Sequence, residues 1–257
     1  MTHLADPIAD PIADPIADPI WSPEEFTARL RAVGANRYHD QHPYHVLMNA
    51  GELDLPSLQG WVANRFYYQI QIPIKDAAIL SNCPERDLRR AWIQRILDHD
   101  GSEGDEGGIE KWLRLGEAVG LTRAELLTQS RLLPGVRYAV DAYVNFCRTK
   151  PWLEAMASSL TELFAPTLMA TRIAAFEKHY PWVKPDGLRY FRGRLTQAPR
   201  DADFALRLVL ERCVTRAEQE KMVAALSFKC ELLWAMLDAM HFAFLTTRRQ
   251  PTDERSA

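Results

Sequence analysis

Apolar residues recur three and four positions apart along most of the chain, which is the spacing of one face of an α-helix. No run of alternating apolar and polar residues competes with this pattern. The first helix is predicted to begin in SPEEF, residues 22–26, where a serine can cap the helix, proline fits its first turn and two acids follow. The pattern therefore predicts an all-α fold. Further helices are predicted at residues 55–82, 84–101, 107–120, 122–133, 135–150, 151–180, 185–198, 202–213 and 215–245.

Two prolines fall inside these helical patterns. Pro73 and Pro166 each remove a backbone hydrogen bond and clash with the preceding turn, so each is expected to kink or break its helix. Kinked helices leave space between neighbours in a bundle. Ligand sites of helical bundles lie in such spaces.

The N-terminal segment differs from the rest, because residues 5–20 repeat the sequence ADPI four times. Proline at every fourth position removes amide donors and restricts the residue before it, so this segment cannot hold a helix or a central strand. We predict a disordered tail over residues 1–21, one helical domain over 22–250 and a flexible C-terminal tail over 251–257. With 257 residues, 47% of them apolar, the chain can bury one large core as a compact single-domain bundle.

Charge and cysteine usage narrow the function classes. The formal net charge is −3, and because the ADPI repeats contribute four aspartates, the remainder carries +1. A nucleic-acid-binding protein would carry a strong basic excess, so no nucleic-acid partner is expected. The four cysteines lack C-x-x-C spacing, which is typical of free thiols in a reducing compartment. With no signal-peptide pattern and no membrane-spanning apolar run, we expect a cytoplasmic protein.

Several helices place polar residues a turn apart within apolar stripes. The pairs are Arg65 and Gln69, Arg95 and His99, and Tyr190 and Arg194, while Lys75, Tyr143 and Lys229 lie singly in similar surroundings. Taken alone, such a residue commonly extends its polar end to solvent or satisfies a backbone carbonyl. As a set, the cations Arg65, Lys75, Arg95, Arg194 and Lys229 have no comparable set of acids on the same faces. Because unpaired buried cations are costly, a converging set predicts an anionic ligand with several carboxylates.

The histidines allow two interpretations. His39, His42 and His45 have a spacing of three residues, and Glu162 or the aspartates beside His99 could join them as metal ligands. However, no H-E-x-x-H or E-x-x-H pair is present, so we expect no metal site. A neutral His99 beside Arg95 is better explained as a catalytic base, because a nearby cation disfavours the imidazolium form.

Longer motifs resemble one known family. They are HPYH, WVANRFYYQ, IPIKDAA, RILDHDG, GGIEKWLRLGEAVG, VDAY, SSLTELFAP and YFRGRL, and together they span about residues 25 to 245. They resemble the pyrroloquinoline-quinone synthase family, which implies a heme-oxygenase-like helical bundle, usually a homodimer. The resemblance also implies a cofactorless oxidase that closes a ring of a bicyclic polycarboxylate quinoline precursor and oxidises it with O2 to pyrroloquinoline quinone, releasing hydrogen peroxide. The implied partners are this substrate, the quinone product and, transiently, other proteins of the same biosynthesis.

The resemblance also implies roles for individual residues. The implied substrate-binding residues are Tyr38, His39, Arg65, Gln69, Lys75, Arg172 and Lys229, with Arg65, Lys75, Arg172 and Lys229 holding carboxylates. The implied catalytic residues are His99, Tyr190, Arg194, Tyr143 and Arg95, with His99, Tyr190 and Arg194 around the oxygen site.

One departure from the family pattern is Met169, which stands three residues before Arg172 where a histidine is expected. Methionine cannot shuttle protons and accepts hydrogen bonds only weakly. We expect that this position is not required for the chemistry. The alternatives are a thiaminase-like hydrolase, which would need a nucleophilic cysteine, a di-iron oxidase, and a carrier that binds the quinone without consuming oxygen.

Overall fold

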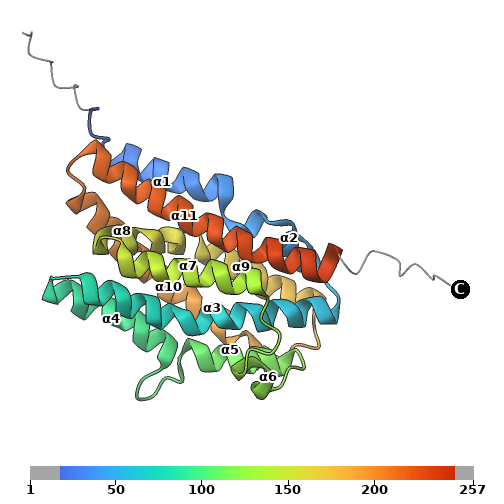
Figure 1. Ribbon diagram of the computed structural model, residues 1–257. Coiled ribbons are helices and arrows are strands. Elements are labelled where there is room, and N and C mark those ends of the chain that lie inside the picture. Colours follow the sequence, from blue (N-terminus) through green and yellow to red (C-terminus); the bar gives the residue numbers. More distant parts are fainter. Residues whose placement is uncertain (1–17, 247–257) are drawn as a thin grey trace, which may run out of the picture.

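The computed structural model describes residues 18–246, and no β-strand occurs among them, so the all-α prediction is confirmed. The predicted C-terminal tail and most of the predicted N-terminal tail lie outside the described residues. Figure 1 shows the α-helices lying side by side. In chain order the helices are α1 (Pro23–Arg37), α2 (Pro43–Ala50), α3 (Leu55–Asn82), α4 (Arg86–Asp100), α5 (Gly107–Ala118), α6 (Arg123–Leu127), α7 (Pro134–Thr149), α8 (Trp152–Ala157), α9 (Ala165–His179), α10 (Arg189–Arg212) and α11 (Arg216–His241).

Four short segments link or extend these helices. They are three 3₁₀ turns, η1 (His39–Gln41), η2 (Ser158–Leu163) and η3 (Pro185–Leu188), and a π-helical turn, η4 (Phe242–Thr246). Within the bundle, α3 packs against α4 and α7, α11 packs against α1 and α7, and α10 packs against α9 and η2. Large side chains such as Trp61, Trp112 and Phe191 are fully buried where these helices meet.

The helix starts follow the sequence signals. Ser22 is the N-cap of α1, as predicted, and Pro23 lies in the first turn. Ser22 also forms a capping box with Glu25. Asp54 caps α3 by accepting a hydrogen bond from the amide of Ser57 at 2.8 Å. The long helices carry buried polar residues into the bundle, Lys75 and Asp76 on α3, and Tyr190, Arg194 and Asp201 on α10.

Three of the predicted helices are divided differently in the structure. The segment 151–180 is not one helix: it forms α8, then the 3₁₀ turn η2, and α9 begins at Ala165 with Pro166 in its first turn. Ser158 donates to the carbonyl of Ala155 at 2.6 Å, and such local bonds compete with helical ones. Conversely, the two helices predicted at 185–198 and 202–213 are the single helix α10, which continues through Pro199.

Smaller differences concern the ends of elements. The helix α3 continues through Pro73 to Asn82, so this proline does not break it. The predicted helix at 122–133 is only the five-residue α6, and η1 with α2 was not predicted at all. Because α2 has eight residues, its periodic pattern is too short to separate from a loop.

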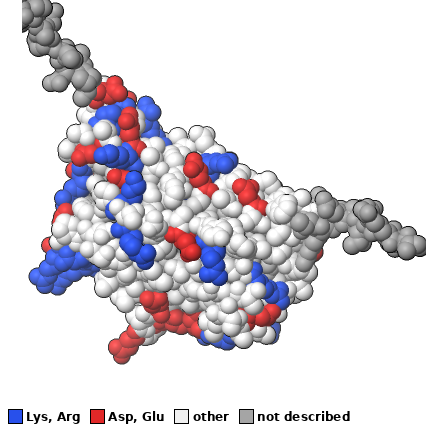
Figure 2. All heavy atoms as spheres, viewed as in Figure 1, with Lys and Arg blue, Asp and Glu red and all other residues white. Residues whose placement is uncertain are grey.

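The surface carries charges of both signs. On the face in Figure 2, acidic and basic side chains are interspersed and separated by uncharged areas. No helix among residues 18–246 is both long and apolar enough to cross a membrane.

Candidate active site

A pocket opens in the bundle, where five α-helices, two 3₁₀ turns and Tyr38, which lies between α1 and η1, contribute side chains. It contains about 430 Å³ of empty space, part of it open to solvent. It is lined by Tyr38, His39, Arg65, Tyr68, Ile72, His99, Thr161, Glu162, Ala165, Met169, Tyr190, Arg194 and Leu233. Six of the predicted site residues therefore meet on one wall although they are far apart in the sequence.

The other six predicted site residues do not line this pocket, but all of them are buried. They are Gln69, Lys75, Arg95, Tyr143, Arg172 and Lys229. All of them except Gln69 are charged or hydrogen-bonded to other residues of the site. Two groups can be distinguished, one neutralised by acids and one without acid partners.

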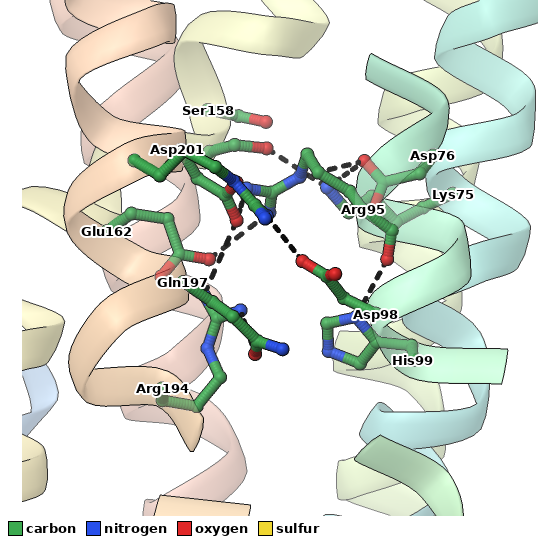
Figure 3. Close-up of polar contacts among 12 residues, drawn as sticks. Lys75, Asp76, Arg95, Asp98, His99, Ser158, Glu162, Arg194, Gln197 and Asp201 are labelled. Carbon is green, nitrogen blue, oxygen red and sulfur yellow. Dashed lines mark hydrogen bonds and ion pairs between the residues drawn. The ribbon is translucent and has the colours of Figure 1, made fainter. Parts of the chain in front are cut away.

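The first group is an ion-pair network centred on Arg95, shown in Figure 3. The Arg95 guanidinium lies 2.6 Å from Asp201, 3.1 Å from Glu162 and 3.5 Å from Asp76. Arg194 shares Glu162 at 2.6 Å and lies 3.7 Å from Asp201. The acids come from α3, η2 and α10, so the network connects these elements to α4.

Lys75 belongs to the same network. Its ammonium donates to Asp76 at 2.6 Å and to the Ser159 hydroxyl at 3.0 Å. Trp92 donates its ring N–H to the same Asp76 oxygen at 2.8 Å. The expectation that no acids accompany the cations is therefore wrong for Lys75, Arg95 and Arg194. Glu162 and Asp201 lie on other elements than Arg95, and Asp76 lies directly beside Lys75, where the helical-face argument could not place them. Asp201 shares α10 with Arg194, but the sequence pattern divided this helix between the two residues.

The network keeps its members charged. Burial alone would raise the pKa of Glu162, but the guanidinium groups of Arg194 and Arg95 outweigh it and lower this pKa to about 2. Burial alone would lower the pKa of Arg95, but Asp201, Asp76 and Glu162 raise it well above its ordinary value. The network is thus ionised at neutral pH.

The second group contains Arg65, Arg172 and Lys229, and none of these has an acidic partner within 4.0 Å among residues 18–246. Buried N–H groups of Arg65 (Nη1) and Arg172 (Nε and Nη2) have no hydrogen-bond partner there. Burial, and then the charge of Arg65, lower the pKa of Arg172 to about 9. An anion that enters the site would accept from these donors and balance the charge of the two guanidinium groups.

Lys229 lies between two aromatic rings. Its ammonium donates to the Tyr68 hydroxyl at 2.6 Å and lies 3.3 Å from the centroid of the Tyr143 ring. The two rings are nearly parallel, with an interplanar angle of 6°. Burial, followed by the charges of Lys75 and Arg65, lowers the pKa of Lys229 well below its ordinary value. Aromatic faces stabilise this cation in part, but they do not neutralise it.

Gln69 and Tyr143 complete this side of the site. Both amide atoms of Gln69 are buried without a hydrogen-bond partner, so this side chain is also available to a ligand or to water. The Tyr143 hydroxyl accepts from Ser158 at 3.3 Å and lies 3.5 Å from the Ser159 hydroxyl. Through Ser159, Tyr143 is connected to Lys75 and thus to the ion-pair network.

His99 is held as a neutral imidazole with one nitrogen free. Its Nδ1 lies 3.0 Å from the carbonyl oxygen of Arg95, which can only accept, so Nδ1 carries the proton. Nε2 is buried and has no hydrogen-bond partner among the described residues. Burial, and then the charge of Arg194, lower the pKa of His99 to about 4. The prediction of a neutral His99 is consistent with this geometry, in which the free lone pair belongs to a ring that lines the pocket.

Two further histidines lie beside the uncompensated cations. His39 lines the pocket, and the ring of His45 lies behind it with the two centroids 4.9 Å apart. The Nδ1 of His45 donates to the carbonyl of His39 at 2.8 Å, and its buried Nε2 has no partner. Burial, and then nearby arginines, lower both pKa values well below the ordinary range. Both rings therefore add no positive charge at neutral pH.

A glycine-rich turn supports His99 and Tyr190. Gly107 has a φ of +80°, and a side chain there would lie 2.6 Å from the carbonyl oxygen of His99. At Gly108 a side chain would lie 3.3 Å from the Tyr190 ring and 3.4 Å from the His99 ring. Only glycine therefore allows the start of α5 to pack so close to these two rings.

Metal ligands and reactive thiols were the alternatives considered from the sequence. Within residues 18–246, no group of three or more His, Cys, Asp or Glu side chains is arranged to hold a metal ion. Glu162, one of the possible ligands, is bound to two arginines instead. All four cysteines are buried, and burial raises the pKa of Cys147 and raises that of Cys230 to about 12. Such thiols are poor nucleophiles at neutral pH.

Five residues of the site were not predicted in these roles. They are Tyr68, Asp76, Glu162, Asp201 and His45. Tyr68 follows Arg65 by three residues on the same helical face, which is a signal that could have identified it. Asp201 lies in a polar stretch, RDAD, that is typical of a helix boundary, so no local pattern indicated that it is buried.

Comparison with known proteins agrees with the fold and with the sequence motifs. In solved structures, a domain of unknown function with a heme oxygenase-like fold from Shewanella denitrificans matches with a TM-score of 0.69 and 12% identity, covering 91% of this chain and 96% of that one. A TenA homologue from P. horikoshii matches with a TM-score of 0.67 and 13% identity, covering 84% of this chain and 97% of that one. At these identities the likeness concerns the fold alone.

Curated relatives are far closer in sequence. A pyrroloquinoline-quinone synthase from Cronobacter sakazakii is 58% identical over 227 residues, which is 88% of this chain and 90% of the relative. One from Pseudomonas putida is 57% identical over the same coverage. The model of the TENA/THI-4/PQQC family matches residues 27–239. The chain therefore belongs to the TENA/THI-4/PQQC family and, within it, to the pyrroloquinoline-quinone synthase family.

Proposed function

We propose that the protein is an oxidase that completes the biosynthesis of pyrroloquinoline quinone. Its substrate would be a bicyclic quinoline precursor with several carboxylates, which is closed to a third ring and oxidised by O2 with release of hydrogen peroxide. The names of the relatives support the reaction. The observation that carries the proposal is a set of three cations, the half-buried Arg65 and the buried Arg172 and Lys229, which have no acidic partner among the described residues.

Substrate binding follows from that imbalance of charge. The free N–H groups of Arg65 and Arg172 would each donate to a carboxylate, and the planar guanidinium matches its two oxygens. Lys229 would contribute a third positive charge from behind Tyr68. Lys75 has the same charge but is already neutralised by Asp76, so we assign it to the support of Arg95 and not to a carboxylate.

Proton removal is assigned to His99. With Nδ1–H fixed on the carbonyl of Arg95, the lone pair of Nε2 can take a proton from a carbon atom of the bound substrate. Each two-electron oxidation removes two electrons and two protons from the substrate and converts one O2 to one H2O2. The electrons would pass from the electron-rich substrate anion directly to O2, without a metal or flavin.

Arg194 and Tyr190 would stabilise the reduced oxygen species. Both line the pocket with His99, and both are buried. Glu162 raises the pKa of Arg194 against the effect of burial, so this guanidinium stays charged. A fixed positive charge in a water-poor site stabilises an oxygen anion more strongly than water does.

The decisive experiment uses the full chain after removal of metals by chelation. It is incubated aerobically with the bicyclic precursor, while the absorbance of the quinone and the amount of H2O2 are followed together. Formation of both supports a cofactorless synthase. Binding of the precursor without either product would contradict the proposal, and activity restored only by iron would indicate a di-iron oxidase.

A matched pair of variants ties the activity to this pocket. Arg194→Gln should abolish most of the quinone formation, whereas Arg90→Gln, at an exposed position on α4, should leave it unchanged. Equal activity of the two variants would exclude the assignment of the oxygen site.

We also propose that the protein works in the cytoplasm as a homodimer. Exposed apolar side chains such as Tyr138 and Phe242, 72% and 65% exposed, are available to a second copy of the chain. Light scattering on the eluting protein measures the molar mass directly. A monomer at micromolar concentration would refute the dimer without affecting the proposed reaction.

A further inference from the structure

Met169 lies on the pocket wall with the groups that we assign to oxygen chemistry. It projects from α9 and lines the same cavity as His99, Tyr190 and Arg194. A thioether sulfur is electron-rich and is oxidised by peroxides. The pocket therefore places an oxidisable sulfur where hydrogen peroxide would be released.

The other methionines of the described chain lack this position. Met169 is 8% exposed, whereas the others are at most 3% exposed and none of them lines this pocket. They are Met48, Met156, Met222, Met236 and Met240. Met169 is therefore more accessible to a small oxidant than the other five methionines, which serve as internal controls.

We infer that Met169 is an oxidation site for hydrogen peroxide. In this step one peroxide oxygen is transferred to the sulfur, so that an S–O bond forms, the O–O bond breaks and water leaves. The thioether is oxidised to the sulfoxide and the peroxide is reduced. The inference rests on the proposed function for the source of the peroxide, but the reactivity of the sulfur does not depend on it.

The sulfoxide would act on substrate binding. Arg172 follows Met169 by three residues, so both side chains project from one face of α9. Buried N–H groups of Arg172 and of Arg65 have no partner, and a sulfoxide oxygen is a strong acceptor. It would therefore occupy donors that a substrate carboxylate needs. Hydrogen peroxide that accumulates during turnover would then weaken the affinity of the enzyme for its substrate.

The first arm of the test needs no activity. The resting full-length protein is treated with dilute hydrogen peroxide, and the gain of one oxygen atom by each methionine is followed by peptide mass spectrometry. Met169 is expected to react first, at least about tenfold faster than the buried methionines, since reactivity follows exposure. Oxidation of Met222 or Met240 at the same rate or faster would overturn the inference.

The second arm uses turnover with the bicyclic precursor, with and without catalase. Oxidation of Met169 that catalase suppresses supports the inference and the proposed source of peroxide together. If the protein forms no peroxide, the proposed function fails while the first arm still decides whether Met169 is the reactive site. If peroxide forms and Met169 stays reduced, the inference fails and the proposed function stands.

The consequence for binding is tested with peroxide-treated protein. Its KM for the precursor should rise about tenfold, as expected when one hydrogen bond to a charged group is lost, and methionine sulfoxide reductase should restore it. Met169→Leu conserves the volume but removes the sulfur, so its KM should not change on the same treatment. Equal loss of affinity in both proteins would show that another residue is responsible.

Discussion

His45 and His99 are held in the same way at two places in the bundle: each donates its Nδ1 proton to a backbone carbonyl and keeps a buried Nε2 without a partner among the described residues. Only His99 lines the pocket. The two rings are therefore matched in tautomer and burial, but they differ in access to a ligand. This difference allows a controlled test of the proposed base.

His99→Asn should separate chemistry from binding. Asparagine can still donate to the carbonyl of Arg95, but it has no lone pair in place of Nε2. We expect kcat to fall at least about 100-fold, the usual contribution of a general base, with little change in affinity for the precursor. The control is His45→Asn, which should retain kcat within about threefold. Steady-state kinetics combined with a binding titration measure both quantities, and similar kcat values for the two variants would remove His99 from the mechanism.

Lys75 and Lys229 are both buried, yet replacing them with methionine should have opposite effects on stability. Lys75→Met leaves Asp76 without its closest cation and should lower the free energy of unfolding by about 3 kcal/mol. Lys229→Met removes a cation that has no acidic partner, so the free energy of unfolding should stay equal or rise by about 1 kcal/mol. Urea denaturation of both variants measures this. If Lys229→Met lost as much stability as Lys75→Met, Lys229 would have a partner that compensates its charge, contrary to the prediction.

The same Lys229→Met variant should lose substrate affinity. Because Lys229 acts on bound carboxylates through its charge and through the Tyr68 hydroxyl, its removal should raise the dissociation constant for the precursor about 10-fold. A titration of binding without O2 isolates this term from catalysis. An unchanged dissociation constant would mean that the carboxylates bind elsewhere.

Asp201→Asn tests the ion-pair network. Asp201 is buried between Arg95 and Arg194, so removing its charge should lower the free energy of unfolding by about 3 kcal/mol. Glu177→Gln breaks the exposed pair with Arg192 and should cost less than about 1 kcal/mol. Equal costs in urea denaturation would show that the network is not a structural element.

The stability of the protein should fall in mild acid because of His99. Its pKa is about 4 in the folded chain and about 6.5 when unfolded, so the unfolded chain binds the proton first as the pH falls. Its contribution is complete above about pH 6.5 and is lost as the pH approaches 4, by up to about 3 kcal/mol. His39 and His45 shift in the same direction and add to the loss.

His99→Asn provides the control for this pH dependence. Denaturation of the original protein and the variant between about pH 7.5 and pH 4.5 should give curves that diverge below pH 6.5, with the variant less sensitive to acid. Parallel curves would mean that His99 is already protonated in the folded state or is accessible to solvent.

Much of the fold could be predicted because helical periodicity is strong here. The long helix 55–82 agrees with α3 to the residue, and the helix starting at Ser22 has the predicted cap. The errors arose where local rules were outweighed by packing, as at Pro199, which lies inside the continuous α10. At 158–163, where Ser158, Ser159, Thr161 and Glu162 interrupt the apolar pattern, a 3₁₀ turn replaces the predicted helix.

The sequence pattern pointed to the basic residues of the site but not to their acidic partners. The cations and His99 could be identified because polar residues inside apolar helical stripes are conspicuous in a sequence. The acids Glu162 and Asp201 could not be assigned to Arg95, because their pairing depends on how η2 and α10 pack against α4, which no local pattern records. The charge balance of the cations was therefore misjudged, and the roles of the predicted site residues stay predictions.

The position of Arg95 in this network has a consequence for the order of folding. Its first partner, Asp76, lies in the neighbouring helix α3, so a hairpin of α3 and α4 can form this contact early, at a small cost in loop closure. Glu162 and Asp201 arrive only when the C-terminal half of the chain docks. An incomplete bundle thus retains a buried guanidinium with too few acids, which disfavours partly folded states. Arg95 therefore couples assembly of its ion-pair network to completion of the fold.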